Sequence, residues 1–440
     1  MTCQNWHPLT NAQQAYWNEF MQYPDLPLST VAHCLEINGK VDLDKLTLAI
    51  KHTLSEAEVL RLTFRRADKQ GHPLQRVCLD DELDVDVFDL RDMDNALEHA
   101  NASMFADANS PLDLEAKLIT KVQIYVIHSQ QVLWYLRTHH IAVDGYSMNL
   151  IEQRCAAIYR CFLKDEKPSR PLNAFSVYTQ ENSDYEQSTR FGIDKAYWDS
   201  YLSAANLDIS NRDIPVTRTV CVERNVPESI TDGLLALSKQ LIIGWSDVLT
   251  LLCAAYLSQN WRTEERTSGI LPVWIPFMNR MGNPCANTPS LMVNTFPYLA
   301  SFDHEEPIES YLKRAVQELR SHYRHSRYRV ENKLASGNHY FLSPFINILP
   351  FEPPQFTTCV VKHHVLAAGT ADGFNVTFRC SPHAAEMRLI LEAESPLFEE
   401  HELKYHSTGL MDYLSKALQD PQSQKPHINQ QIINTNNKNS

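Results

Sequence analysis

The chain has 440 residues, of which 43% are hydrophobic, and it carries 40 basic against 53 acidic side chains, a net charge of −13. This length is enough to bury two cores of ordinary domain size. The acidic balance disfavours a nucleic acid or an anionic membrane as partner and favours a cationic small molecule.

Cysteine usage and hydropathy indicate a reducing compartment and no membrane span. The ten cysteines are scattered, no Cys-x2-Cys pair occurs, and no secretory leader precedes them. The longest apolar run near the middle of the chain, Val248 to Leu257, is too short to cross a bilayer. We therefore expect a cytoplasmic protein with mostly buried thiols.

Hydrophobic periodicity predicts alternating helices and strands in the first half of the chain. The predicted helices are one capped by Thr10 or Asn11, then Leu43–Leu54, Met93–Ala106 and Met148–Arg160. The predicted strands are Ala32–Ile37, Val59–Phe64, Gln75–Leu90, Lys117–His128 and Val132–Arg137. This pattern predicts the α/β (α+β) class.

A charged, proline-containing stretch, 164–171, indicates a surface connection after the first half. We therefore place a domain boundary near residue 175 and divide the chain into 1–175, 176–420 and a Gln/Asn-rich tail, 421–440, expected to be disordered. The predicted helices of the second part are Phe175–Leu202, Ile230–Leu241, Ser246–Asn260, Ile308–Tyr323 and Leu403–Leu418. Its predicted strands are Thr217–Val226, Gly269–Arg280, Leu291–Pro297, Phe345–Pro350, one after Gly373, and Met387–Ala393.

Two of these strands have features that bear on their position. Prolines interrupt Gly269–Arg280, so this strand suits a sheet edge or the wall of a site. We predict that the strand after Gly373 pairs with Met387–Ala393 as a hairpin.

The strongest chemical signal is His139-His140-x3-Asp144-Gly145, which lies on a predicted strand-to-helix turn. A neutral imidazole can accept a proton near pH 7, and Asp144 can pair with a cation or fix the turn. Gly145 allows a sharp bend or the close approach of a substrate. Together these residues meet the needs of acyl transfer.

Other interpretations of the motif remain open. An adjacent histidine pair is often merely packed or solvated. His139 and Asp144 also fit the His-x4-Asp pattern of membrane glycerolipid acyltransferases, and His-His-x3-Asp could ligate a metal. The first normally accompanies membrane anchoring and the second needs further ligands at close spacing, so we predict no metal site here. A second pair, His363-His364, lacks the Asp and Gly and is interpreted as structural.

Motifs in a fixed order identify the family that the sequence resembles. They are Pro8-Leu9-Thr10 with Gln13 and Trp17, Glu58–Phe64, His139–Gly145, Tyr197-Trp198, Pro276–Arg280, Val293–Pro297 and Asn347. Over residues 8–418 the chain resembles the condensation domains of nonribosomal peptide synthetases, most closely the free-standing amide synthases of the vibriobactin type. The resemblance implies a V-shaped pseudodimer of two chloramphenicol-acetyltransferase-like lobes with a central tunnel.

The resemblance assigns catalytic roles within the motif. His140 would hold the attacking amine and take its proton, while the Gly145 amide would lie near the thioester carbonyl. Asp144 and His139 would be structural, with Arg280 as the expected salt-bridge partner of Asp144.

Substrate-binding roles are expected for Asn347, Trp274 and Asn375. Asn347 lies in an otherwise apolar predicted strand, where a buried amide needs partners, so it is either a structural bridge or a site residue. Asn375 stands where many family members carry Asp.

The implied reaction transfers an aryl acyl group of the 2,3-dihydroxybenzoyl type to a soluble amine, a polyamine such as norspermidine, in catechol siderophore biosynthesis. The donor would arrive on the 4'-phosphopantetheine of a separate aryl carrier protein, and no cofactor would be bound. Alternatives are another amine such as a hydroxylated histamine, a carrier-bound aminoacyl acceptor, a non-catalytic carrier-docking module and a metal-dependent hydrolase. The resemblance favours a monomer.

Overall fold

A computed structural model describes residues 6–66, 72–78, 83–116, 118–203, 218–261, 270–301, 306–330, 343–369, 373–395 and 397–422. The tail expected to be disordered, 421–440, lies outside these residues apart from positions 421 and 422.

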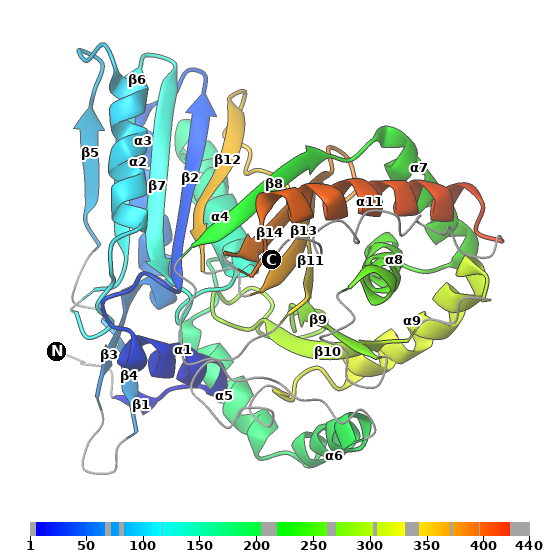
Figure 1. Ribbon diagram of the computed structural model, residues 1–440. Coiled ribbons are helices and arrows are strands. Elements are labelled where there is room, and N and C mark those ends of the chain that lie inside the picture. Colours follow the sequence, from blue (N-terminus) through cyan, green and yellow to red (C-terminus); the bar gives the residue numbers. More distant parts are fainter. Residues whose placement is uncertain are drawn as a thin grey trace, which may run out of the picture.

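The described residues form two lobes that lie side by side (Figure 1). The elements up to the connection between the lobes are β1 (His7–Pro8), α1 (Asn11–Gln22), β2 (Thr30–Asn38), α2 (Leu43–Glu56), η1 (Glu58–Arg61), β3 (Leu62–Arg65), β4 (Leu74–Val77), β5 (Val85–Asp89), α3 (Ala96–Ala108), β6 (Lys121–His128), β7 (Gln131–His139), α4 (Gly145–Leu163), α5 (Phe175–Glu186) and α6 (Thr189–Ser203). The later elements are β8 (Thr219–Asn225), α7 (Glu228–Leu241), α8 (Trp245–Asn260), β9 (Leu271–Phe277), β10 (Asn294–Ala300), α9 (Ile308–Arg324), β11 (Phe345–Pro350), β12 (Val360–Ala368), β13 (Phe374–Cys380), β14 (Arg388–Glu394) and α11 (Glu400–Gln419).

The N-lobe is a five-stranded sheet of order β12-β2-β7-β6-β5 with helices on both faces. One face, with Leu35 and Trp134, buries its apolar side chains against α2 and α4. The other face, with Cys34 and Tyr135, packs against α3. Because side chains alternate along a strand, β2 and β7 supply residues to both cores.

The C-lobe is a six-stranded sheet of order β10-β9-β11-β13-β14-β8. Its core lies on one face, where α7, α8, α9 and α11 pack on inward-facing residues such as Val273, Ile346 and Val376. α8 is buried along nearly its whole length, as its continuous apolar run predicts. Two lobes of mixed α/β structure confirm the predicted fold class, whereas the central tunnel stays a prediction.

Strand β12 crosses the boundary that we place at residue 175. It lies far along the chain, yet it pairs antiparallel with β2 from Val360↔Asn38 to Ala368↔Val31 and so forms an edge of the N-lobe sheet. A cut at 175 therefore does not separate the two sheets. No strand is predicted over β12 from the sequence, and even a strand pattern carries no information about which sheet the strand joins.

Other local predictions need correction. Val59–Arg61 begins the predicted strand Val59–Phe64 but lies in the 3-10 helix η1, and β3 starts only at Leu62. The segment predicted as one helix from Phe175 to Leu202 is divided into α5 and α6. The hairpin predicted after Gly373 is confirmed by the pairing of β13 with β14.

The edge position predicted for the proline-containing strand is wrong. β9 lies between β10 and β11, and β10 occupies the edge. The prolines are tolerated because β11 pairs with β9 at a single position, Phe345↔Trp274. Pro272 and Pro276 have no partner on β11, so the N–H that proline lacks is not needed as a donor to that strand.

No single helix of the described residues is long and apolar enough to cross a membrane. Only α7 and α8 taken together have the necessary length and apolar composition, and they are bent by 109° at the break between them.

A glycine in α11, Gly409, lies where α11 packs closely against α8. A Cβ on Gly409 would lie 2.7 Å from Tyr256 Oη, and Tyr256 is 1% exposed, so its ring has little room to move. We expect Gly409→Ala to lower the free energy of unfolding by about 1–3 kcal/mol through overpacking. The matched control is Gly192→Ala in α6, where a Cβ meets nothing within 4 Å and helix propensity alone should stabilise by up to about 1 kcal/mol. Urea unfolding of both variants measures the difference; equal stabilities would contradict the packing argument.

Candidate active site

The motif lies where β7 ends and α4 begins. β7 ends at His139, and Asp144 caps α4 from an extended conformation, with its carboxylate accepting the Ser147 N–H at 2.8 Å. A cap of this kind satisfies an amide of the first helical turn that has no intrahelical acceptor. Local sequence therefore fixes the turn that presents His140.

The Asp144 carboxylate is buried and accepts hydrogen bonds from both lobes. Arg280 Nη2 lies 3.1 Å from Oδ1 and 3.2 Å from Oδ2, which confirms the predicted salt bridge. The backbone N–H groups of Met292 and Val293 each donate to Oδ2 at 2.9 Å. Asp144 is 2% exposed, so its position suits a structural role and leaves no surface for a substrate.

Arg280 joins this network to the loop before β10. Its guanidinium donates to Thr288 O at 2.8 Å, to Ser290 O at 3.0 Å and to Ser147 Oγ at 2.8 Å, and it lies over the Tyr146 ring. Ser147 Oγ in turn donates to Ser290 O at 2.7 Å. The start of α4 is thus held against the C-lobe by charge-assisted hydrogen bonds.

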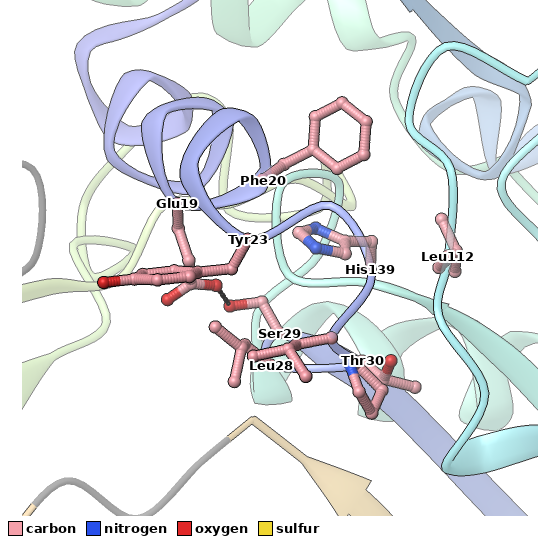
Figure 2. Close-up of a pocket in the computed structure, with 10 residues that line it drawn as sticks. Glu19, Phe20, Tyr23, Leu28, Ser29, Thr30, Leu112 and His139 are labelled. Carbon is pink, nitrogen blue, oxygen red and sulfur yellow. Dashed lines mark hydrogen bonds between the residues drawn. The ribbon is translucent and has the colours of Figure 1, made fainter. Parts of the chain in front are cut away.

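His139 is buried beside a small pocket (Figure 2), and its Nδ1 accepts the Ile141 N–H at 3.1 Å. Burial, with smaller effects of His140 and Arg137, lowers the pKa of His139 to about 3. The ring is therefore neutral at working pH. Figure 2 shows it near Phe20 and Tyr23, which agrees with the expected structural role.

His140 is half-buried, and both of its ring nitrogens lie near carbonyl oxygens. Nδ1 is 3.1 Å from Val143 O, within the motif turn, and Nε2 is 3.1 Å from Ala368 O, at the end of β12. A neutral imidazole has one N–H, so it can donate to only one of them. The Tyr16 ring stacks on His140 at 5.7 Å between centroids and limits its rotation.

Gly145 is exposed at the first position of α4. A Cβ here would meet nothing within 4 Å, so open space lies in front of the residue. Its N–H belongs to the first helical turn, whose amides have no intrahelical acceptor, and the helix dipole adds partial positive charge there. This position can receive a carbonyl oxygen that gains negative charge.

Sequence analysis missed Gly369, which follows Ala368. It has φ +79°, and a Cβ there would lie 3.3 Å from His140 Cδ2 and 3.6 Å from Nε2. The signal in the sequence was a glycine at a turn, but only the pairing of β12 with β2 brings that turn to the motif. Tyr16, on α1, was missed because only the packing of the folded chain brings its ring onto His140.

The predicted substrate-binding residues share one face of the C-lobe sheet and are distant from α4 in the sequence. Trp274 pairs with Phe345, Phe345 with Asn375, and Asn347 with Thr377, so their side chains lie opposite the C-lobe core. Asn347 and Asn375 are half-buried. Trp274 is 1% exposed, so in this conformation it offers almost no surface to a substrate.

The sequence profile described as "Condensation domain" matches residues 3–431. The chain belongs to the condensation domain family. Members of this family are amide-bond-forming acyltransferases that need no cofactor of their own for the reaction, and their acyl donor is carried on the phosphopantetheine of a partner carrier protein.

Relatives and solved structures agree with the family. The condensation enzyme VibH is 32% identical with a TM-score of 0.83, covering 93% of this chain and 97% of that one. The first condensation domain of the calcium-dependent antibiotic synthetase has a TM-score of 0.81 at 21% identity, covering 96% and 98% of the two chains, and shows the shared fold alone.

Curated relatives are much longer than this chain. The dimodular nonribosomal peptide synthase of Bacillus subtilis is 26% identical over 93% of this chain, which spans 17% of the relative. Enterobactin synthase component F of Escherichia coli is 25% identical over 94% of this chain, which spans 32% of that protein. Siderophore-related synthetases are thus among the relatives of this condensation domain.

Removing Arg280 should destabilise the protein more than removing an exposed arginine. In Arg280→Met the Asp144 charge stays buried without its cationic partner, so we expect a loss of about 3–5 kcal/mol in the free energy of unfolding. The control is Arg388→Met, because Arg388 pairs with Glu223 at 2.8 Å with both side chains about half exposed, and such pairs contribute about 1 kcal/mol or less. Guanidinium unfolding compares the two; similar losses would show that the buried pair is not a stabilising tie.

Gly369→Ala should slow amide formation while the protein stays folded. The added methyl strains a positive φ and presses on the His140 ring, and a small misplacement of a catalytic group can cost up to about 100-fold in rate. Gly282→Ala is the control, since Gly282 has φ +70° but nothing within 4 Å of its Cβ position. Single-turnover rates, with circular dichroism to check folding, separate the two effects; equal rates would remove Gly369 from the site.

Proposed function

We propose that the chain is an amide synthase of catechol siderophore biosynthesis that transfers an aryl acyl group, of the 2,3-dihydroxybenzoyl type, from an aryl carrier protein to a soluble polyamine. The observation that carries this proposal is the geometry at His140. Its half-buried imidazole lies at the turn that starts α4, where the open Gly145 position offers an amide to a thioester carbonyl.

Direct aminolysis fits this geometry better than an acyl-enzyme. Among the described residues, the ring nitrogens of His140 contact two carbonyl oxygens and neither a hydroxyl nor a thiol. The nearby Ser147 hydroxyl is engaged with Asp144, Ser290 and Arg280. No activated nucleophile is therefore provided in this part of the chain, and the substrate amine is the attacking group.

The proposed acyl transfer uses the imidazole of His140 and the backbone amide of Gly145. The amine displaces the Ala368 carbonyl from His140 Nε2 and attacks the thioester carbonyl carbon. His140 takes a proton from the amine nitrogen, the Gly145 amide donates to the developing oxyanion, and the C–S bond breaks. The proton then passes to the phosphopantetheine sulfur, so thioester and amine become amide and thiol.

Charge and resemblance support a polyamine acceptor. The chain carries a net charge of −13, which attracts a cationic substrate. One nitrogen must be neutral to attack, and a partly desolvated site favours that form. VibH, at 32% identity, is a condensation enzyme of similar length, since this chain covers 97% of it.

The proposed contacts to the acceptor amine come from the face of the C-lobe sheet that lies opposite the C-lobe core. Asn347 and Asn375 lie on the same face as Arg379, whose charge acts on His33 of the N-lobe. That face is therefore turned towards the N-lobe, and the two amides can hold a bound amine or water. The described cysteines are all free, which suits the cytoplasmic location that we propose.

The decisive experiment is product analysis by mass spectrometry with a dihydroxybenzoyl-loaded aryl carrier protein and a panel of amines. We expect amide with a free polyamine, and a rate about 10²–10⁴-fold lower in His140→Ala, because proton transfer is lost. His99→Ala, on the exposed face of α3, controls for loss of a histidine as such.

The other outcomes identify the alternatives. Equal rates in His140→Ala would reduce this residue to scaffold. Amide only with a carrier-bound aminoacyl acceptor would place the chain in peptide elongation, and preference for a hydroxylated histamine would change the amine. Absence of amide with every acceptor would favour a carrier-docking module.

A further inference from the structure

Three side chains with metal-ligating atoms converge in the N-lobe, outside the site described above. They are His33 on β2, Glu152 on α4 and His363 on β12. His33 Nδ1 lies 2.7 Å from Glu152 Oε1, His363 Nε2 lies 3.0 Å from His33 Nδ1, and His363 Nε2 lies 3.4 Å from Glu152 Oε1. The three atoms thus form a small triangle.

The fold explains why these atoms meet. His363 pairs with Leu35, two residues from His33, so the two rings project from the same sheet face on adjacent strands. α4 covers that face and brings Glu152 onto it. Leu35, Trp134 and Leu136 line the small pocket that His33 and Glu152 share, so the surroundings are apolar.

The negative charge of a carboxylate buried in apolar surroundings needs a partner. The N–H groups of the two imidazoles cannot both serve as that partner here. Glu152 is 2% exposed. If both imidazoles donated to its oxygen, their two N–H groups would point at each other across the 3.0 Å between the nitrogens. If only one donated, the other nitrogen would bring a lone pair towards the carboxylate. A cation at the centre satisfies all three lone pairs at once.

The chemistry of the three side chains suits a metal ion. The two histidines would bind it as neutral imidazoles and Glu152 as a carboxylate, so binding would release any proton that these groups hold. The positive charge of Arg379 acts on His33 and opposes a cation, which will limit the affinity.

The distances are also near those of a metal centre. Zinc binds imidazole nitrogen and carboxylate oxygen at about 2.0–2.2 Å, which places the ligand atoms of a tetrahedron about 3.3–3.5 Å apart. The separation of 3.4 Å already fits, the one of 3.0 Å needs to widen by about 0.3–0.5 Å, and the one of 2.7 Å by about 0.6–0.8 Å. Imidazole ligands favour zinc or a similar late transition metal over magnesium or calcium.

We propose that His33, Glu152 and His363 bind one divalent transition metal ion of the zinc type. The ion ties β12 to β2 and α4. β12 ends at Ala368, which contacts His140, and α4 starts at Gly145 in the motif. The metal therefore stabilises the arrangement of the crossover strand and the motif helix. This site is independent of the proposed acyl transfer, and its test uses no substrate.

The test begins with the full chain freed of metal by chelation at pH 7.5. Calorimetric titration with Zn²⁺, with metal analysis after desalting, should give one ion per chain and a higher unfolding temperature. Co²⁺ in its place should give visible absorption typical of low-coordinate nitrogen and oxygen ligands. His363→Gln should weaken Zn²⁺ binding at least tenfold, and His33→Gln should do the same.

The matched control lies on the same strand. His364→Gln removes the neighbouring histidine, whose side chain pairs instead with Glu36 at 3.0 Å. This variant should bind Zn²⁺ like the parent chain. The proposal is overturned if the metal-free parent takes up no stoichiometric Zn²⁺, or if His363→Gln binds as tightly as His364→Gln. His363 is partly exposed, so its variant is expected to fold, which circular dichroism checks.

Discussion

The buried Asp144 carboxylate is the constraint on which the active-site geometry depends. It belongs to the N-lobe, yet Arg280 and the amides of Met292 and Val293, all from the second half of the chain, satisfy it. A buried charge without partners costs several kcal/mol, so the lobes are held in the one arrangement that keeps these donors in place. Because Asp144 also caps α4, the same arrangement fixes the turn that carries His140.

Strand β12 is the second tie between the two halves of the chain, and it contacts His140, the proposed catalytic histidine, directly. Its pairing with β2 brings Ala368 O to 3.1 Å from His140 Nε2. In the proposed mechanism this carbonyl occupies the place that an attacking amine needs. Displacement of the carbonyl is easier when Nε2 carries a lone pair, since that contact then gains no hydrogen bond. Gly369 allows this close approach of β12 to His140, because a Cβ at its position would lie 3.3 Å from His140 Cδ2.

The sequence was most informative where interactions are local or rest on a strong motif. It predicted the turn around His140, the hairpin of β13 and β14, and the Asp144–Arg280 contact. It neither predicted β12 as a strand nor placed it, because even a clear strand pattern does not show the partner of the strand. The His33, Glu152 and His363 cluster was hidden for the same reason, since its ligands come from three distant elements and show no close spacing.

Burial explains why two adjacent histidines have such different roles. The end of β7 directs His139 into the protein, where its pKa falls to about 3 and its Nδ1 is used by the Ile141 amide. A ring so held can neither take a proton near neutral pH nor reach a substrate. His140, one residue later, leaves the strand and stays half-buried, with Nε2 against a carbonyl that can be displaced. The turn fixed by Asp144 thus separates a packing residue from the one that we propose to be reactive.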